Sequence, residues 1–444
     1  MGINIPANAA TKTVKEIQPG LNYLRFKDYF EFSEQVNKIP SHRLLALLRG
    51  RNEGVLSLNI DHKSTLDENQ VVHPAIGRLV VHTGWDIESS AWLKRTLELA
   101  WRAKLLLKLN LQLTAHLREQ SDEAAIEVVN RNMKDLLLAA PAGEKVTLGL
   151  DPGFRTGVKT VVIDANGKLL DTAVIYPHAP QRQWQQALGK LQALVNKYKV
   201  ALVAIGNGTA SRETEQLDKE LASQCESPFD SLIVSEAGAS VYSASELASI
   251  EFPTVDVSIR GAISIARRLQ DPLSELVKID PKAIGVGQYQ HDVNQPLLKQ
   301  KLNEVVASCV NHVGVELNTA SYPILAHVSG LGTTLAKNIV AYREENGDFT
   351  ERKQLLKVPK MGKKTYEQAA GFLRVSGSKN PLDNSGVHPE NYLLVEQISK
   401  DYKTSVKELI GNKEIIDQIV WGKYQNDKQG ELTLLDIRKE LLQP

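Results

Sequence analysis

A change of pattern near residue 143 constrains the fold of this 444-residue chain more than any other feature. Pro141 and Gly143 end a long helical stretch, and five short runs rich in β-branched residues follow. Short turns separate the first three runs, as in hairpins, whereas helical stretches precede and follow the fourth. Three antiparallel strands followed by alternating helix and strand predict a mixed α/β sheet. The runs are VTLGLD, GVKTVVID, LLDTAVIY, VALVAIGN and SLIVSE.

The chain before this sheet is expected to be a helical scaffold. Residues 1 to about 145 have helical periodicity, with one extended interruption from Gly54 to Asp61. One helix is predicted from an N-cap at Ser89 to about Glu119, and a second from Asp122 to Ala140.

Three tryptophans in this scaffold have two possible roles. They could be platforms for nucleobases, or apolar anchors on the buried stripe of a helix. Because an aromatic side chain on an apolar helical stripe usually packs into a core, we predict that Trp85, Trp92 and Trp101 are core residues.

An internal repeat divides the rest of the chain. VSGLGTTLAKNIVAYR, from Val328, aligns with VPKMGKKTYEQAAGFLR, from Val358, at an offset of 30 residues. We therefore expect five parts: a scaffold over 1–145, the sheet domain over 146–275, a connecting loop and helix over 276–322, paired helical hairpins over 323–376, and C-terminal helices over 377–444.

Composition excludes several classes of protein. Hydrophobic residues at 42% and charged residues at 24% rule out a disordered chain. Cys225 and Cys309 have neither CxxC nor CxxH spacing, which excludes a zinc ribbon and suits a reducing cytoplasm. No run approaches the roughly 18 apolar residues of a membrane span, so we expect a soluble, cytoplasmic protein. The net charge of +1 means that any basic surface must come from local clustering.

Three acidic residues are placed to meet at one rim of the sheet. Asp151 and Glu236 each end a strand, and Asp256 begins the helix VSIRGAISIARRL. Three converging carboxylates could hold two Mg²⁺ or Mn²⁺ ions about 4 Å apart and cleave a phosphodiester. Each acid also suits a structural role as turn residue, helix-dipole partner or N-cap, and Arg260 could pair with Asp256. We favour a non-catalytic domain, because such sites are easily lost while the fold persists.

The repeat carries the second constellation, a Gly-x-Gly turn between two helices. Such a turn lets the N–H groups that begin the next helix approach a phosphate. From Ser321 to Gly377, nine Lys or Arg stand against five Asp or Glu, a local net charge of +4. The hairpins could serve only for packing or protein contact, but a doubled, basic motif favours binding to RNA or DNA with no cofactor. The expected contacts are Gly330, Gly332, Lys337, Lys360, Gly362, Lys363 and Lys364.

Several motifs together resemble the Tex family of bacterial transcription accessory proteins, over essentially the whole chain. The resemblance implies a helical scaffold around a YqgF-type, RNase H-like domain, followed by tandem helix-hairpin-helix motifs. It implies cytoplasmic work on nucleic acid during transcription, by a monomer that has RNA polymerase or a transcription complex as a further partner. The motifs are SHRLLALLRGRNEGVLSL, LGLDPGFRTGVK, SEAGASVYSASELAS, RGAISIARRLQDPLSELVKIDPKAIGVGQYQHDV and VSGLGTTLAKNIVAYREENG.

Within that resemblance, the DxG motif falls on Asp151, and Glu236 and Asp256 are the second and third acids of the RuvC-like pattern. Family members usually begin with a further helical region and end with an OB-fold RNA-binding domain. Neither is visible, so we expect a fragment or a shortened relative. Pro359 and Lys360 stand where the first glycine of the second hairpin would lie, which weakens the case for a phosphate contact there.

Three functions therefore compete. The favoured one is a nucleic-acid-binding transcription accessory scaffold, and the second is a metal-dependent nuclease. The third is an actin-like ATPase in which DPGFRTG and IGNGTAS bind phosphate. An actin-like ATPase needs a cleft between two RNase H-like units, and only one fits into the chain.

Overall fold

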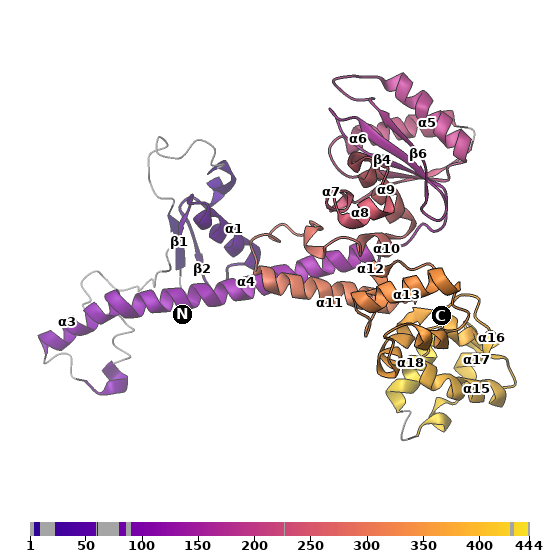
Figure 1. Ribbon diagram of the computed structural model, residues 1–444. Helices are drawn as coiled ribbons and strands as arrows, with labels where there is room; N and C mark the ends of the chain where they lie inside the picture. The colour runs from indigo at the N-terminus through magenta and orange to yellow at the C-terminus, as the bar shows by residue number, and fades with distance from the viewer. Residues whose placement is uncertain are drawn as a thin grey trace. The chain divides into compact units, whose positions relative to one another are not determined.

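The computed structural model describes residues 4–8, 23–58, 60, 80–85, 90–225, 227–426 and 430–442 (Figure 1). The chain forms two compact units. The first comprises Met1–Arg131 and Gly287–Leu298, and the second comprises Asn132–Val286 and Lys299–Pro444. Among the described helices, none combines the length and the apolar composition needed to cross a lipid bilayer.

The first unit contains a small antiparallel sheet in place of the single extended interruption that the sequence predicted. Strand β1 (Asn4–Asn8) pairs with β2 (Phe32–Gln35) on one side and with β3 (Ser57–Leu58) on the other. Helix α1 (Ser41–Asn52) follows β2 and buries the consecutive residues Leu44 to Leu48, so it is buried on more than one face. The strands β1 and β2 were missed because neither of their sequences, NIPAN and FSEQ, is a run of β-branched residues.

A continuous helical stretch follows, and the prediction of two separate helices is wrong. Helix α3 (Ala91–Ala100), a π-helical turn (Trp101–Leu105) and α4 (Leu106–Leu137) run on without a break. Asp122, taken as the start of a second helix, lies inside α4, where its buried carboxylate accepts a hydrogen bond from the Asn294 amide at 3.0 Å. A tertiary contact therefore explains the polar residue that suggested a helix start.

Two of the three tryptophans are not core residues. Trp85 is 50% exposed and Trp92 is 75% exposed, and α3 buries none of its side chains. Trp101 is half-buried. The apolar stripe of α3 was assigned to a core, but nothing in the described part of the unit covers it. Helix α3 begins after Ser90, whose hydroxyl accepts from the Leu93 amide, while the expected cap Ser89 lies outside the described residues.

The mixed sheet predicted from the sequence is confirmed in the second unit. Five strands lie in the order β6-β5-β4-β7-β8. The pairs β4–β5 and β5–β6 are antiparallel, whereas β4–β7 and β7–β8 are parallel. The strands are β4 (Thr147–Asp151), β5 (Val158–Ile163), β6 (Leu169–Ile175), β7 (Leu202–Gly206) and β8 (Asp230–Val234).

Helices cover both faces of this sheet (Figure 1). Leucines of α5 (Trp184–Tyr198) and α6 (Ser211–Gln224) pack on one face. Helix α9 (Val257–Gln270) packs on the other face. It lies so close to β4 that a Cβ on Gly149 would be 2.7 Å from the Ala262 carbonyl oxygen. Short helices α7 (Ala239–Ser243), α8 (Glu246–Glu251) and α10 (Pro272–Leu276) complete this part.

The tandem hairpins predicted from the repeat are also confirmed. Helix α11 (Gln295–Val313) leads to strand β9 (Val315–Glu316), which pairs in parallel with β10 (Leu373–Arg374). Between these strands lie α12 (Tyr322–Leu325), α13 (Thr333–Asn346), the 3₁₀ helix η5 (Arg352–Lys357) and α14 (Lys363–Ala369). The chain then forms α15 (Tyr392–Asp401), α16 (Val406–Leu409), α17 (Lys413–Gln418) and α18 (Glu431–Leu442), which share one apolar core.

Candidate nucleic-acid interface

The two hairpin turns have the same backbone hydrogen bonds, residue for residue, at the offset of 30. The Leu331 amide donates to the Val328 carbonyl at 3.0 Å, and the Met361 amide donates to the Val358 carbonyl at 3.0 Å. The following helices begin alike, because α13 and α14 have Gly332 and Gly362 as N-caps. The sequence repeat is therefore a structural repeat.

Lys360 adopts the backbone conformation of the glycine that it replaces. Its φ is +67°, and φ of Gly330 in the first hairpin is +82°. A residue with a Cβ disfavours this left-handed region, and glycine does not. The second turn is therefore complete despite Pro359-Lys360, so the missing glycine does not count against a phosphate contact there.

Each turn is held by the helix of the other hairpin. The Asn338 side chain on α13 donates to the Pro359 carbonyl at 2.8 Å. A Cβ on Gly330 would lie 2.8 Å from Cβ of Gln368, which is on α14. Asn338 and Gln368 are themselves 30 residues apart. These reciprocal contacts make the two hairpins one packed unit.

The glycines at the two helix starts are not required by the fold. Gly332 has φ −110° and ψ 174°, and Gly362 has φ −85° and ψ 158°, which are extended conformations open to any residue. A Cβ on either glycine would meet no atom within 4 Å. No side chain caps α13 or α14, so the first-turn N–H groups have no side-chain acceptor. A small, open surface with exposed donors suits an anion that approaches closely.

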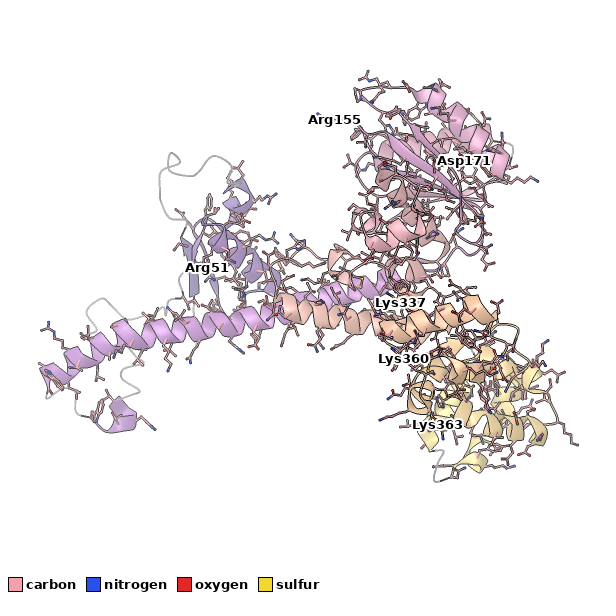
Figure 2. All side chains as sticks on the ribbon, viewed as in Figure 1. Arg51, Arg155, Asp171, Lys337, Lys360 and Lys363 are labelled. Carbon is pink, nitrogen blue, oxygen red and sulfur yellow. The ribbon has the colours of Figure 1, made fainter. Side chains whose placement is uncertain are left out.

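Lysines surround these helix starts. Figure 2 places Lys337, Lys360 and Lys363 on the hairpin pair. The Lys337 ammonium lies over the Tyr322 ring, 5.1 Å from its centroid. Lys363 pairs with Glu367 at 3.9 Å, but both side chains are exposed, so the pair is weak. Within the described chain, Lys360 and Lys364 form no ion pair, which leaves their charges available to a ligand.

The structure brings two of the three predicted acids to the same rim of the sheet. Asp151 ends β4, and Glu236 follows β8. Burial raises the pKa of Asp151 to about 6, an effect that Lys159 opposes and the nearby Glu236 reinforces. The Glu236 carboxylate lies directly over Gly208, where a Cβ would collide with it.

Asp256 is the N-cap of helix α9. It caps α9 by accepting hydrogen bonds from the Ser258 amide at 2.8 Å and hydroxyl at 2.6 Å, and these bonds lower its pKa. Arg260 is buried and donates instead to Ser249 and to the carbonyls of Ser243 and Val255. In the part of the chain that the structure describes, no group of three His, Cys, Asp or Glu side chains could hold a metal ion. Asp256 serves as a helix cap and does not complete a three-residue group with Asp151 and Glu236, so the catalytic role of the three acids stays a prediction.

Two residues at the rim were missed by the sequence reasoning. Lys159 lies directly opposite Asp151 in the β4–β5 register, and its ammonium is held by the Thr156 hydroxyl at 2.6 Å. The buried Arg268 on α9 donates to the carbonyls of Ser235 and Ala237, on either side of Glu236. Counting residues across the β4–β5 hairpin could have found Lys159. No local signal points to Arg268, because its partners lie more than 30 residues away.

Four family models match this chain. They are described as Tex central region-like (residues 8–129), Tex protein YqgF-like domain (145–270), helix-hairpin-helix motif (310–374) and HHH domain (380–444). "Transcriptional accessory protein Tex" of Neisseria gonorrhoeae is 53% identical over 422 residues, 95% of this chain and 55% of that protein. "Protein YhgF" of Escherichia coli (strain K12) is 51% identical over 424 residues, again 95% of this chain and 55% of the relative.

The chain belongs to the Tex family. It spans about half the length of the curated relatives that it matches. A human relative, "S1 RNA-binding domain-containing protein 1", is 38% identical over 361 residues, which are 79% of this chain and 36% of that protein.

The C-terminal HHH domain of this Tex-family chain contains a third turn between helices, which the sequence analysis passed over. Gly411 joins α16 to α17 with φ +76°, as Gly330 does in the first hairpin. However, the Asn412 side chain accepts from the Ile415 amide, and the Gly411 amide donates to the Leu441 carbonyl at 2.7 Å. The third turn is capped and packed against α18, so only the first two turns present open helix starts.

Proposed function

We propose that this chain is a nucleic-acid-binding transcription accessory factor that holds the phosphate backbone without reading base sequence. The observation that carries this proposal is the pair of equivalent turns, each with an uncapped helix start at an open glycine and with lysines beside it. The name of the Tex-family relative from Neisseria gonorrhoeae and the match to the helix-hairpin-helix model support it.

The donors determine what kind of recognition is possible. Main-chain N–H groups and lysine ammonium groups contact phosphates, but they lack the forked geometry that reads a base edge. Each neutralised phosphate releases condensed counterions, so log affinity should fall linearly with log salt, by about 0.7 to 0.9 per phosphate. Base identity should matter little.

A charge-reversal pair tests the proposal. Lys363→Glu with Lys364→Glu should weaken binding to all sequences alike and reduce the salt slope by about 1.4 to 1.8, since two phosphate contacts are lost. The matched control is Lys168→Glu with Lys190→Glu, two exposed lysines of the sheet domain. Titrations with single-stranded and duplex DNA and RNA at several salt concentrations give the slopes. Equal binding by both double variants would reassign the hairpins to packing or protein contact.

Metal-dependent cleavage of phosphodiesters by Asp151, Glu236 and Asp256 is a second candidate function. The shared rim position of Asp151 and Glu236 favours it, while the capping role of Asp256 counts against it. Only this activity would need Mg²⁺ or Mn²⁺, and we propose that binding alone requires no cofactor. Nuclease assays with Mg²⁺ or Mn²⁺, which compare the wild type with Asp151→Asn, test this activity. Cleavage by the wild type that Asp151→Asn abolishes would establish a nuclease.

We further propose that the chain works as a monomer beside RNA polymerase or a transcription complex. The name "Transcriptional accessory protein" of the relative supports this partner. Light scattering of the purified chain and co-purification with RNA polymerase, with and without nuclease treatment, test both statements.

A further inference from the structure

A cavity of about 710 Å³ lies between the second hairpin and residues 380–392. This volume is within the range of roughly 300 to 1,000 Å³ that is typical of small-ligand sites. Its walls include the rings of Tyr366 and Tyr392, with Leu356 and Pro389 beside them. Lys364, in the first turn of α14, also lines it, so the cavity adjoins the proposed phosphate contact.

A network of hydrogen bonds fixes the loop that supplies Asp383 and Tyr392 to the cavity lining. The fully buried Arg352 donates hydrogen bonds to the carbonyls of four residues in the adjoining loop, which are Leu382, Asp383, Ser385 and Val387. The Tyr392 hydroxyl donates to the Asp383 carboxylate at 2.8 Å. The Asp383 carboxylate also accepts from Ser378 and from the Arg352 amide, so its bonding capacity is largely used. These hydrogen bonds fix Tyr392 and the loop from Leu382 to Val387 beside the cavity.

The remaining polar groups determine what could enter. The side chains of Gln368 and Lys353 line the cavity and make no hydrogen bond or ion pair in the described chain. Glu351, Glu367 and Glu390 also line it and are exposed, so their charges oppose entry of a phosphate. An uncharged, flat group with donors and acceptors on its edge suits aromatic walls and a free amide better than an anion does.

We propose that this cavity receives one unpaired nucleobase of a strand whose backbone rests on the second hairpin. The proposal rests on the proposed function, because the hairpin must first hold the strand. The Tyr366 ring would stack on the base, and the Gln368 amide would face its edge. An unpaired base is favoured because it enters without the free-energy cost of unstacking a duplex.

Abasic substitution separates the base from the backbone. The probes are a 12-nucleotide single strand of thymidines and the same strand with abasic sites throughout, which keeps every phosphate. Wild type should bind the abasic strand about tenfold more weakly, as expected for loss of one stacked base. Tyr366→Ala should lose that discrimination, whereas Tyr366→Phe keeps the ring and should retain it. Thermal unfolding of both variants shows whether they fold.

Three possible results distinguish failure of the nucleobase proposal from failure of the proposed function. If wild type binds both strands equally while Lys363→Glu with Lys364→Glu weakens both, the cavity takes no base and the hairpin proposal stands. If neither the abasic substitution of the strand nor the double lysine substitution of the protein changes the affinity, the proposed function itself fails. If an oligolysine peptide binds wild type but not Tyr366→Ala and the two strands bind alike, the acidic mouth receives a basic side chain of a protein partner, and the nucleobase proposal is overturned.

Discussion

Glycines occur at both the sheet and the hairpin pair, but the structure uses them in opposite ways. On the sheet, a Cβ on Gly149 would lie 2.7 Å from the Ala262 carbonyl and 2.8 Å from the Ala266 side chain. At the hairpins, a Cβ on Gly332 or Gly362 would meet nothing within 4 Å. The sheet glycine is required by internal packing, whereas the hairpin glycines leave room for something outside the chain.

The charged side chains of the sheet rim and of the hairpins differ in the same way. Asp151 on the sheet rim is a half-buried carboxylate with a raised pKa, and Lys159, whose charge opposes that rise, comes from the adjacent strand. The hairpin lysines are exposed, and the chain gives them few carboxylate partners. Asp151 and Arg268 at the sheet rim interact with other residues of the domain, whereas the hairpins present uncapped helix starts and exposed lysines to a ligand.

Gly149→Val should have the largest effect on stability. The added side chain would push against the backbone of α9, which cannot move aside as a flexible side chain could. We expect the free energy of unfolding of the sheet domain to fall by at least about 3 kcal/mol, at the upper end of overpacking. Urea denaturation followed by circular dichroism measures it. An unchanged midpoint would show that α9 is not closely packed on β4.

Asp151→Asn should change the pH dependence of stability. The folded-state pKa of about 6 lies above the ordinary value of 3.8, so the contribution of Asp151 to wild-type stability is greatest below pH 4 and falls as the pH rises from 4 to 6. A shift of about two pKa units corresponds to about 3 kcal/mol. The stability of Asp151→Asn relative to wild type should therefore increase over this range, as measured by urea denaturation at several pH values.

Asp256→Asn is the control for that experiment. The pKa of Asp256 is lowered, so the wild-type carboxylate stabilises the fold above its ordinary pKa and loses that contribution as the pH falls. This variant should gain no relative stability between pH 4 and 6. The same pH profile in both variants would mean that burial of Asp151 is not the cause.

Lys360→Gly should raise stability and lower affinity together. Glycine relieves the left-handed conformation at φ +67°, which we expect to add about 1 kcal/mol, while one positive charge is lost from the turn. Thermal unfolding and a nucleic-acid titration measure the two effects. Gly330→Ala is the reverse control, because its Cβ would crowd Gln368 and should destabilise the hairpins. A destabilised Lys360→Gly would contradict the equivalence of the turns.

Gly332→Val should have the smallest effect on stability, less than about 1 kcal/mol, because a Cβ at this extended position meets no atom within 4 Å, although valine is a poorer N-cap than glycine. Binding should nevertheless weaken, since the branched side chain would block a phosphate at the start of α13. Unchanged affinity, measured by the same titration, would place the ligand elsewhere.

Local sequence patterns predicted much of this molecule. Each strand of the five-stranded sheet is a short run bounded by turn residues, so its position and pairing class could be inferred from neighbours a few residues apart. Asp151 and Glu236 could be assigned to one rim because parallel strands end on the same side. The hairpins could be predicted from the offset of 30 residues, which is a property of the sequence alone.

Tertiary structure decided what those patterns could not. Whether Trp92 is buried depends on whether another element covers α3, and whether Asp122 begins a helix depends on Asn294, 172 residues later. Lys360 adopts a conformation that its residue type disfavours, because the surrounding hairpin imposes it. Spacing along the chain fixes the elements and the face that each residue occupies. Only packing between distant segments fixes which groups are satisfied internally, and therefore which remain open to a ligand.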